Sequence, residues 1–403
     1  MISKKVFLKD FSLNLAASLL LTGIIQLIIY PLIGRRVGNE VFGDILILLG
    51  IINMVSNMIG SSLNNIRLIE RESGFLNFGV LLKKSIILVI FLSFFLSFIV
   101  LGEKIFIYNI LCIIVITVLT MIRIYSVVYY RITLSYNKIL LNNIVLLFGN
   151  LIGLYIFGLT ENWYIIFILG EIFSIVYIYW TSDIKKESLE KDNKFEEIHI
   201  KWKQLILSNS ITNIMMYLDR IIISPIIGSE NVTIYFVASL VGKIIGIVFQ
   251  PVSSIILSYI TKNKENNGRK IFKMTLISVL VVGVIAYLLT IIFSPLIIRL
   301  LYSDLFVEAS KYFYIANLAS IFMIMGGLIQ PVILKFCPMF TQKWIQISYM
   351  ISYICFSFPL MKIMGLKGFC IAAVLANLIR LITTIGVGYY YIIKLDDLKK
   401  VRK

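Results

Sequence analysis

Acidic residues, cysteines and histidines are scarce in this sequence. Its 403 residues include 21 Asp and Glu, four Cys and one His. The cysteines, Cys112, Cys337, Cys355 and Cys370, fall within or beside apolar blocks without paired spacing, which argues against a disulfide framework or a zinc site. The lone His199 lies in a polar segment. A relay of histidines across a membrane is therefore excluded.

Motifs and loops that would support covalent chemistry are also absent. No G-x-x-x-x-G-K-[ST] sequence occurs, so the chain does not hydrolyse ATP through a P-loop. The largest outer loop that we expect, 295–310, is too short to form a catalytic domain. These absences argue against a polytopic glycosyltransferase or a polysaccharide polymerase. We expect no cofactor and no bound metal.

Apolar residues dominate the sequence. They make up 59% of the chain against 15% charged residues, and the mean hydropathy is +0.94. Many apolar blocks approach the roughly 20 residues that cross a bilayer, and the first is too long for a signal peptide. We predict an all-α membrane protein of about 12 transmembrane helices. The predicted spans are 12–34, 41–65, 80–101, 105–130, 139–158, 162–181, 203–227, 232–260, 271–294, 311–335, 343–363 and 367–393.

The positive charges are distributed unevenly between the two sides of these spans. The formal net charge is +17, and most of the 38 Lys and Arg residues fall in loops on the side of both termini. The other side holds only Arg35, Arg36, Lys104, Arg299, Lys311, Lys362 and Lys367. This asymmetry predicts cytoplasmic termini, and it explains the basic charge without nucleic-acid binding.

The two halves of the chain resemble each other weakly. Tyr30–Gly34 and Ser224–Gly228 each carry proline and glycine before a short loop with an acid, at an offset near 190 residues. Six spans per half give both halves the same orientation, as expected for parallel repeats. We therefore predict an N-terminal lobe at 1–181, a polar cytoplasmic linker at 182–202 and a C-terminal lobe at 203–403.

Polar residues recur at helical spacing inside several spans. Such stripes face other helices or water, because an amide in hydrocarbon costs several kcal/mol. One stripe alone is more simply explained as contact between helices. Five stripes, four of them at matching positions in the two halves, favour a shared aqueous cavity. The amides that we select as substrate-binding candidates are Asn53, Asn57, Asn213, Gln250 and Asn377.

Six charged residues lie well inside the spans, away from their ends, where each needs a partner or a function. The bases are Arg123, Arg220, Lys243 and Arg380, and the acids are Glu171 and Asp219. Lys243 and Arg380 are the stronger candidates for binding substrate, whereas Arg123 could extend to the cytoplasmic surface. Glu171 either titrates or binds a cation, or it neutralises an arginine across the bundle. Asp219 is suited to pair with a nearby base such as Arg220 or Lys243. The excess of bases suits an anionic substrate, and phosphate is the natural choice.

Three short motifs resemble those of a known family. These are Arg36-x-Gly38-x-Glu40-x-Phe42-Gly43, Leu218-Asp219-Arg220, and Gly228-x-Glu230-Asn231-Val232 followed by Tyr235. Together with length and helix count, they resemble polysaccharide repeat-unit flippases, the O-antigen and capsule translocases of the multidrug/oligosaccharidyl-lipid/polysaccharide exporter superfamily. Thr233 and Ile234 depart from the family pattern, in which a small glycine precedes the tyrosine.

This resemblance implies two six-helix lobes around a central cavity in a bacterial cytoplasmic membrane. The substrate would be an undecaprenyl-pyrophosphate-linked oligosaccharide, flipped by alternating access, and other polysaccharide-assembly proteins are expected partners. Glu171 and Asp219 would then be the candidates for coupling transport to an ion gradient. The alternatives are a cation-coupled multidrug antiporter of the same superfamily and a membrane-embedded glycan-assembly enzyme or scaffold. The antiporter predicts an acidic cavity, whereas bases outnumber acids here.

Overall fold

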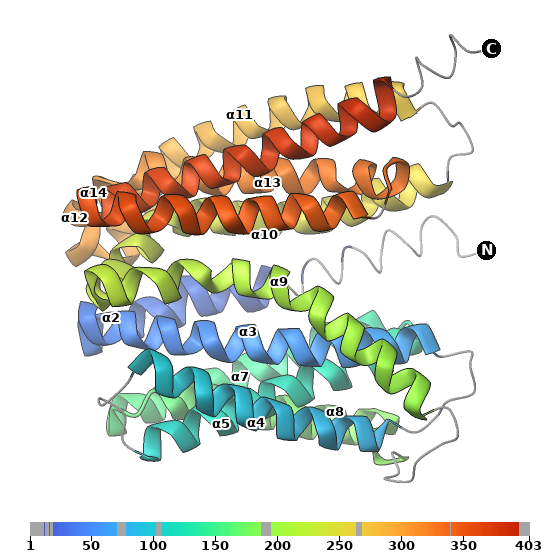
Figure 1. The fold of residues 1–403 in the computed structure, drawn as a ribbon. Helices are drawn as coiled ribbons and strands as arrows, with labels where there is room; N and C mark the ends of the chain where they lie inside the picture. The colour runs from blue at the N-terminus through green and yellow to red at the C-terminus, as the bar shows by residue number, and fades with distance from the viewer. Residues whose placement is uncertain are drawn as a thin grey trace. The chain divides into compact units, whose positions relative to one another are not determined.

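Long apolar helices make up almost all of the structure, a computed structural model (Figure 1). It describes residues 12, 16, 19–70, 78–101, 107–186, 195–262, 268–338 and 340–394. Within these ranges, 11 helical segments are long and apolar enough to cross a membrane. The contacts between Cα atoms divide the chain into two units, Met1–Ile221 and Ile222–Lys403. The predicted class, a multi-pass all-α membrane protein, is confirmed.

The first unit is built around α3, α5, α7 and α8. The helix α5 packs on α3, α4 and α8, and α7 packs along α8. The helical elements up to the division are η1 (Ile25–Ile29), α2 (Tyr30–Val37), α3 (Asn39–Ile69), α4 (Gly79–Leu101), α5 (Ile107–Ser126), α6 (Val128–Ile132), α7 (Tyr136–Thr160), α8 (Tyr164–Thr181), η4 (Asp183–Lys186) and the first part of α9 (Phe195–Ile227).

The second unit is centred on α13, which packs against α10, α11 and α14. Phe272, Met325, Val332 and Leu381 belong to its buried apolar core. After the end of α9, its elements are α10 (Ser229–Lys262), α11 (Gly268–Leu301), η5 (Ser303–Leu305), α12 (Phe306–Ser310), α13 (Phe313–Phe336), α14 (Phe340–Gly388) and η6 (Tyr389–Lys394).

Two glycines with left-handed backbone break the chain at equivalent points of the two halves. Gly38 (φ 82°) separates α2 from α3, and Gly228 (φ 90°) separates α9 from α10. This conformation costs glycine little because it has no Cβ. The sequence comparison had paired Gly34 with Gly228, but the helix continues through Gly34. The equivalent glycine is Gly38, because it carries the break.

The long helix α14 consists of two helices joined at Gly365. This residue has φ 58° and ψ −138°, which are not helical values. A continuous helix from 340 to 394 would be about 80 Å long, far beyond a bilayer core of about 30 Å. The two arms, coloured orange and red in Figure 1, are therefore separate spans. Counted separately, they raise the number of spans in the described residues from 11 to the 12 predicted.

Two element boundaries differ from the sequence prediction by more than four residues. The helix α9 begins at Phe195, inside the segment predicted as a polar linker, and Phe195 and Trp202 are buried on the first unit. The helix α11 continues through Pro295 to Leu301, so the predicted loop 295–310 was wrong in its first part. Proline is tolerated in membrane helices because neighbouring groups satisfy the carbonyl that it leaves without a donor.

Candidate functional site

Arg123 and Glu171 form an ion pair between α5 and α8. Arg123 Nε lies 2.6 Å from Glu171 Oε2, and Arg123 Nη2 lies 3.1 Å from Oε1. The Thr120 hydroxyl donates to Oε1 at 3.0 Å. The arginine and carboxylate side chains are only 16% and 9% exposed, so each charge is neutralised largely by the other. This contact is the neutralisation that the sequence allowed as one interpretation of Glu171.

Arg220 is buried in α9 and reaches the backbone of α3. Its Nη1 donates to the carbonyl of Leu46 at 2.9 Å, and its Cζ lies 5.7 Å from the ring centre of Tyr217. The side chain passes Gly50, where an added Cβ would lie 3.2 Å from Arg220 Cδ. The Asp219 carboxylate accepts a hydrogen bond from the backbone N–H of Arg220 at 2.9 Å. Gly50 thus provides the space through which the guanidinium approaches α3.

Further polar contacts join α9 to α3 in antiparallel register. Lys201 Nζ lies 2.8 Å from Glu70 Oε1, and Asn209 Nδ2 donates to the Ser62 hydroxyl at 2.9 Å. Polar contacts therefore line part of the interface between α3 and α9. These contacts are of the kind that joins polar helices in membranes.

The asparagines selected from the sequence bond to their own helices. The Nδ2 atoms of Asn53, Asn57, Asn213 and Asn377 each donate to the carbonyl one turn earlier, at 2.7 to 2.9 Å. Such bonds occupy only one of an amide's hydrogen-bonding groups. Asn377 Oδ1 is buried, and no described residue hydrogen-bonds to it. One turn further along the helix lies Arg380.

Arg380 stacks on an aromatic ring. Its Cζ lies 5.1 Å from the centre of the Tyr349 ring on the other arm of α14. No carboxylate in the described part of the chain lies within 4.0 Å of its guanidinium. An aromatic face attracts a cation without neutralising its charge. Arg380 therefore differs from Arg123, whose charge Glu171 offsets.

Lys243 also lies beside a ring, and aromatic residues connect it to Arg380. Its Nζ is 5.1 Å from the centre of the Tyr235 ring. Buried rings continue from there in edge-on contacts with centroids 4.9 to 5.9 Å apart, in the order Tyr235, Phe369, Tyr353 and Tyr349. The structure thus places Lys243 and Arg380 at the two ends of one row of four buried aromatic rings.

Gln250 lies in α10, but its side chain is outside the described residues. Among the residues that are described, no group of three or more His, Cys, Asp and Glu could hold a metal ion.

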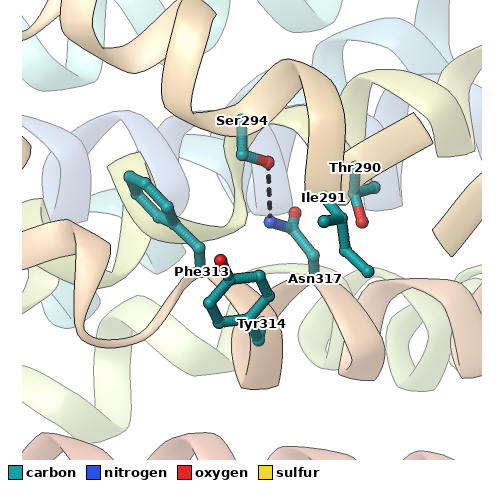
Figure 2. Close-up of a pocket in the computed structure, with 6 residues that line it drawn as sticks. All are labelled: Thr290, Ile291, Ser294, Phe313, Tyr314 and Asn317. Atoms are coloured by element: carbon teal, nitrogen blue, oxygen red, sulfur yellow. Dashed lines mark hydrogen bonds between the residues drawn. The ribbon is translucent and has the colours of Figure 1, made fainter. Parts of the chain in front are cut away.

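Sequence reasoning missed Asn317, a buried residue of α13 that contacts two other helices. Its Oδ1 accepts from the backbone N–H of Gly242 at 2.8 Å, and its Nδ2 donates to the Ala238 carbonyl at 3.2 Å. Nδ2 also donates to the Ser294 hydroxyl at 3.0 Å, and Figure 2 shows this bond beside a small pocket at the junction of α11 and α13. The sequence signal that could have identified Asn317 is a single amide within an apolar block, because such an amide must find hydrogen-bond partners inside a membrane.

Comparisons with known proteins identify the fold. No family model matches the chain, and no curated protein matches it. A solved structure of the lipid II flippase MurJ, in an inward closed conformation, has a TM-score of 0.62 at 16% identity, over 94% of this chain and 86% of that one. An inward-facing multidrug resistance MATE family transporter of the MOP superfamily gives 0.60 at 14% identity, over 96% of both chains. The Vibrio cholerae MATE transporter VcmN, in its bent form, gives a TM-score of 0.59 at 12% identity, over 96% of this chain and 98% of that one.

The chain has the fold of MATE transporters and MurJ. At 12–16% identity this likeness establishes the fold alone. It confirms the predicted MATE-like architecture of about 12 helices, and the proteins that it resembles are transporters.

Proposed function

We propose that this protein transports an anionic lipid-linked oligosaccharide across a membrane by alternating access. Its substrate is of the undecaprenyl-pyrophosphate type, and the membrane is the bacterial cytoplasmic membrane with both chain termini inside. The fold supports transport, because MurJ, which has the same fold, is a lipid II flippase. The sequence motifs and the excess of bases within the spans support a glycan carried on a diphosphate.

The observation that carries the proposal is the environment of Arg380. Arg380 lies over the Tyr349 ring in a membrane-spanning helix, and no carboxylate of the described residues lies within 4.0 Å to neutralise its charge. Such a charge is expensive in a membrane unless it serves an anion. We assign Arg380 and Lys243 to the diphosphate. Arg220, Asn53, Asn57, Asn213, Gln250 and Asn377 are the remaining candidates for polar contacts with the substrate.

Arg123 has a smaller role in this proposal, because its charge is already offset by Glu171. Glu171 and Asp219 remain the candidates for coupling to an ion gradient. The lobes 1–181 and 203–403, joined by the linker 182–202, are proposed as the two moving parts. Motion at this division would separate α9 from α3 and break the Asn209–Ser62 contact. Membrane lipids and other polysaccharide-assembly proteins are proposed partners.

The experiment that tests the function measures flipping in proteoliposomes. An undecaprenyl-pyrophosphate-linked oligosaccharide is incorporated, and its exposure in the outer leaflet is followed with a membrane-impermeant glycosidase. We expect protein-dependent exposure of the inner pool, and its loss in R380A and K243A variants that still fold. Exposure at the rate of empty liposomes for the wild type would refute the proposal, and full activity in both variants would refute the binding assignment.

A cationic multidrug exporter is the second candidate, since the solved MATE structures share the fold at nearly the same TM-score as MurJ. It predicts efflux of a cationic dye such as ethidium. The same vesicles distinguish the two functions: dye efflux without flipping supports the exporter, and flipping without efflux supports the flippase.

A further inference from the structure

Asn317 holds the two ends of a single hydrogen bond of α10. In a regular helix the N–H of residue 242 donates to the carbonyl of residue 238. Here the Asn317 amide contacts both groups: Oδ1 accepts from Gly242 N–H at 2.8 Å, and Nδ2 donates to Ala238 O at 3.2 Å. The side chain thus spans one turn of a neighbouring helix, with its donor and acceptor each matched to the opposite kind of group.

The surroundings require this arrangement. Asn317 is 1% exposed and Ala238 is fully buried, so a rotated amide would leave polar groups without partners. Gly242 leaves the necessary space: an added Cβ would lie 2.8 Å from Asn317 Oδ1 and 2.7 Å from Ser320 Cβ. Any larger residue at position 242 would move α13 away from α10.

The turn held by Asn317 lies directly beside Lys243. The Lys243 ammonium group contacts Tyr235, which is eight residues earlier on the same helix, and the turn 238–242 lies between them. The Asn317 amide anchors this turn to α13 through two backbone groups of α10, so the position of the turn depends on that side chain. The geometry of this turn therefore sets where Lys243 lies relative to the aromatic row.

We propose that Asn317 is a positioning residue for Lys243, acting through the Ala238–Gly242 turn of α10 rather than by touching substrate. This inference rests on the proposed function for the role of Lys243 in binding a diphosphate. Its geometric part, the dependence of Lys243 on Asn317, is independent of what the protein transports.

The first measurement therefore concerns position alone. The purified full-length chain is treated with acetic anhydride, and the rate of acetylation of Lys243 is measured by mass spectrometry relative to exposed Lys270. In N317A we expect the relative rate at Lys243 to change at least threefold. Ser294→Ala is the matched control, because it removes only the third contact of Asn317 and leaves both bonds to α10; its rate should equal that of the wild type.

If N317A does not fold, N317D serves in its place. The aspartate keeps the acceptor for Gly242 N–H but lacks the donor for Ala238 O, so it should also change the rate at Lys243. An unchanged rate in a folded N317A or N317D protein overturns the inference, whatever the protein transports.

The second measurement is a double-mutant cycle of binding to undecaprenyl pyrophosphate in nanodiscs. We expect N317A and K243Q each to raise the Kd about tenfold, and the double variant to bind no more weakly than K243Q alone. If the fold-changes in Kd of the two single variants instead multiply in the double variant, Asn317 acts on stability rather than on Lys243. That result would overturn the inference. A changed acetylation rate with no wild-type binding would refute the proposed function and leave the positioning role supported.

Discussion

The guanidinium of Arg123 and the carboxylate of Glu171 meet in two parallel contacts, Nε with Oε2 and Nη2 with Oε1. This bidentate geometry is the strongest form of an arginine–carboxylate pair. It joins α5 to α8 inside the first unit.

Removing one member of this pair should destabilise the protein more than removing both. Glu171→Gln leaves a largely buried, uncompensated arginine, a change that typically costs about 3–5 kcal/mol. We expect E171Q to lower the melting temperature of the purified protein more than the double variant R123Q/E171Q does. Melting followed by fluorescence in detergent checks this order. If Glu171 instead serves an ion gradient, E171Q would melt like the wild type and change only the ion dependence of transport.

Arg380 should not be replaceable by lysine. A guanidinium stacks on a ring and donates in a planar fork, whereas an ammonium group does neither. We expect R380K to slow flipping at least tenfold and Y349A to slow it similarly, whereas Y349F, which keeps the ring, retains activity. Arg299 is an exposed arginine at the end of α11 and provides the control: R299A should flip substrate at the wild-type rate. Equal activity of R380K and wild type would contradict the stacking role.

Gly50 should accommodate a β-branched side chain poorly. An added Cβ would lie 3.2 Å from Arg220 Cδ, and the two γ-methyl groups of valine extend further. We expect Gly50→Val to displace Arg220 from the Leu46 carbonyl and to destabilise the protein by about 1–3 kcal/mol. Gly158 is the matched helical glycine, because nothing lies within 4 Å of an added Cβ there. Equal melting temperatures for G50V and G158V would show that the space left by Gly50 for the Arg220 side chain does not contribute to stability.

The contact between α7 and α8 should depend on Gly149 and Gly153, which form a G-x-x-x-G pattern. A Cβ on Gly153 would lie 2.5 Å from Ile166 Cα, and one on Gly149 would lie 2.8 Å from the Leu169 carbonyl oxygen. Small residues allow helix backbones to approach in this way in membranes. We expect G153A to lower stability although alanine favours helices, and G158A to preserve or raise it. Thermal melting of the two variants, compared with the wild type, measures both effects.

Hydropathy alone predicted the number of helices because each span must be apolar over its whole length. It also predicted a break near Gly365, where two apolar blocks of spanning length adjoin. The pairing of Arg123 with Glu171 could not be derived, since it depends on which helices become neighbours. The same limit applies to Asn317, whose partners on α10 are backbone groups that carry no sequence signal. Sequence therefore identifies which polar groups need partners, and packing decides which partners they find.

The glycine turn at Gly365 has a consequence for how the Arg380 contact behaves during motion. Tyr349 and Arg380 lie at nearly equal distances along the chain from this one-residue turn, on opposite arms of a hairpin. Because the connection is so short and Tyr353 contacts Phe369 across it, we expect the two arms to move as one body. Their separation should therefore stay constant while the rest of the molecule changes conformation. A pair of probes on these arms would give an internal ruler against which the movement of every other helix can be measured.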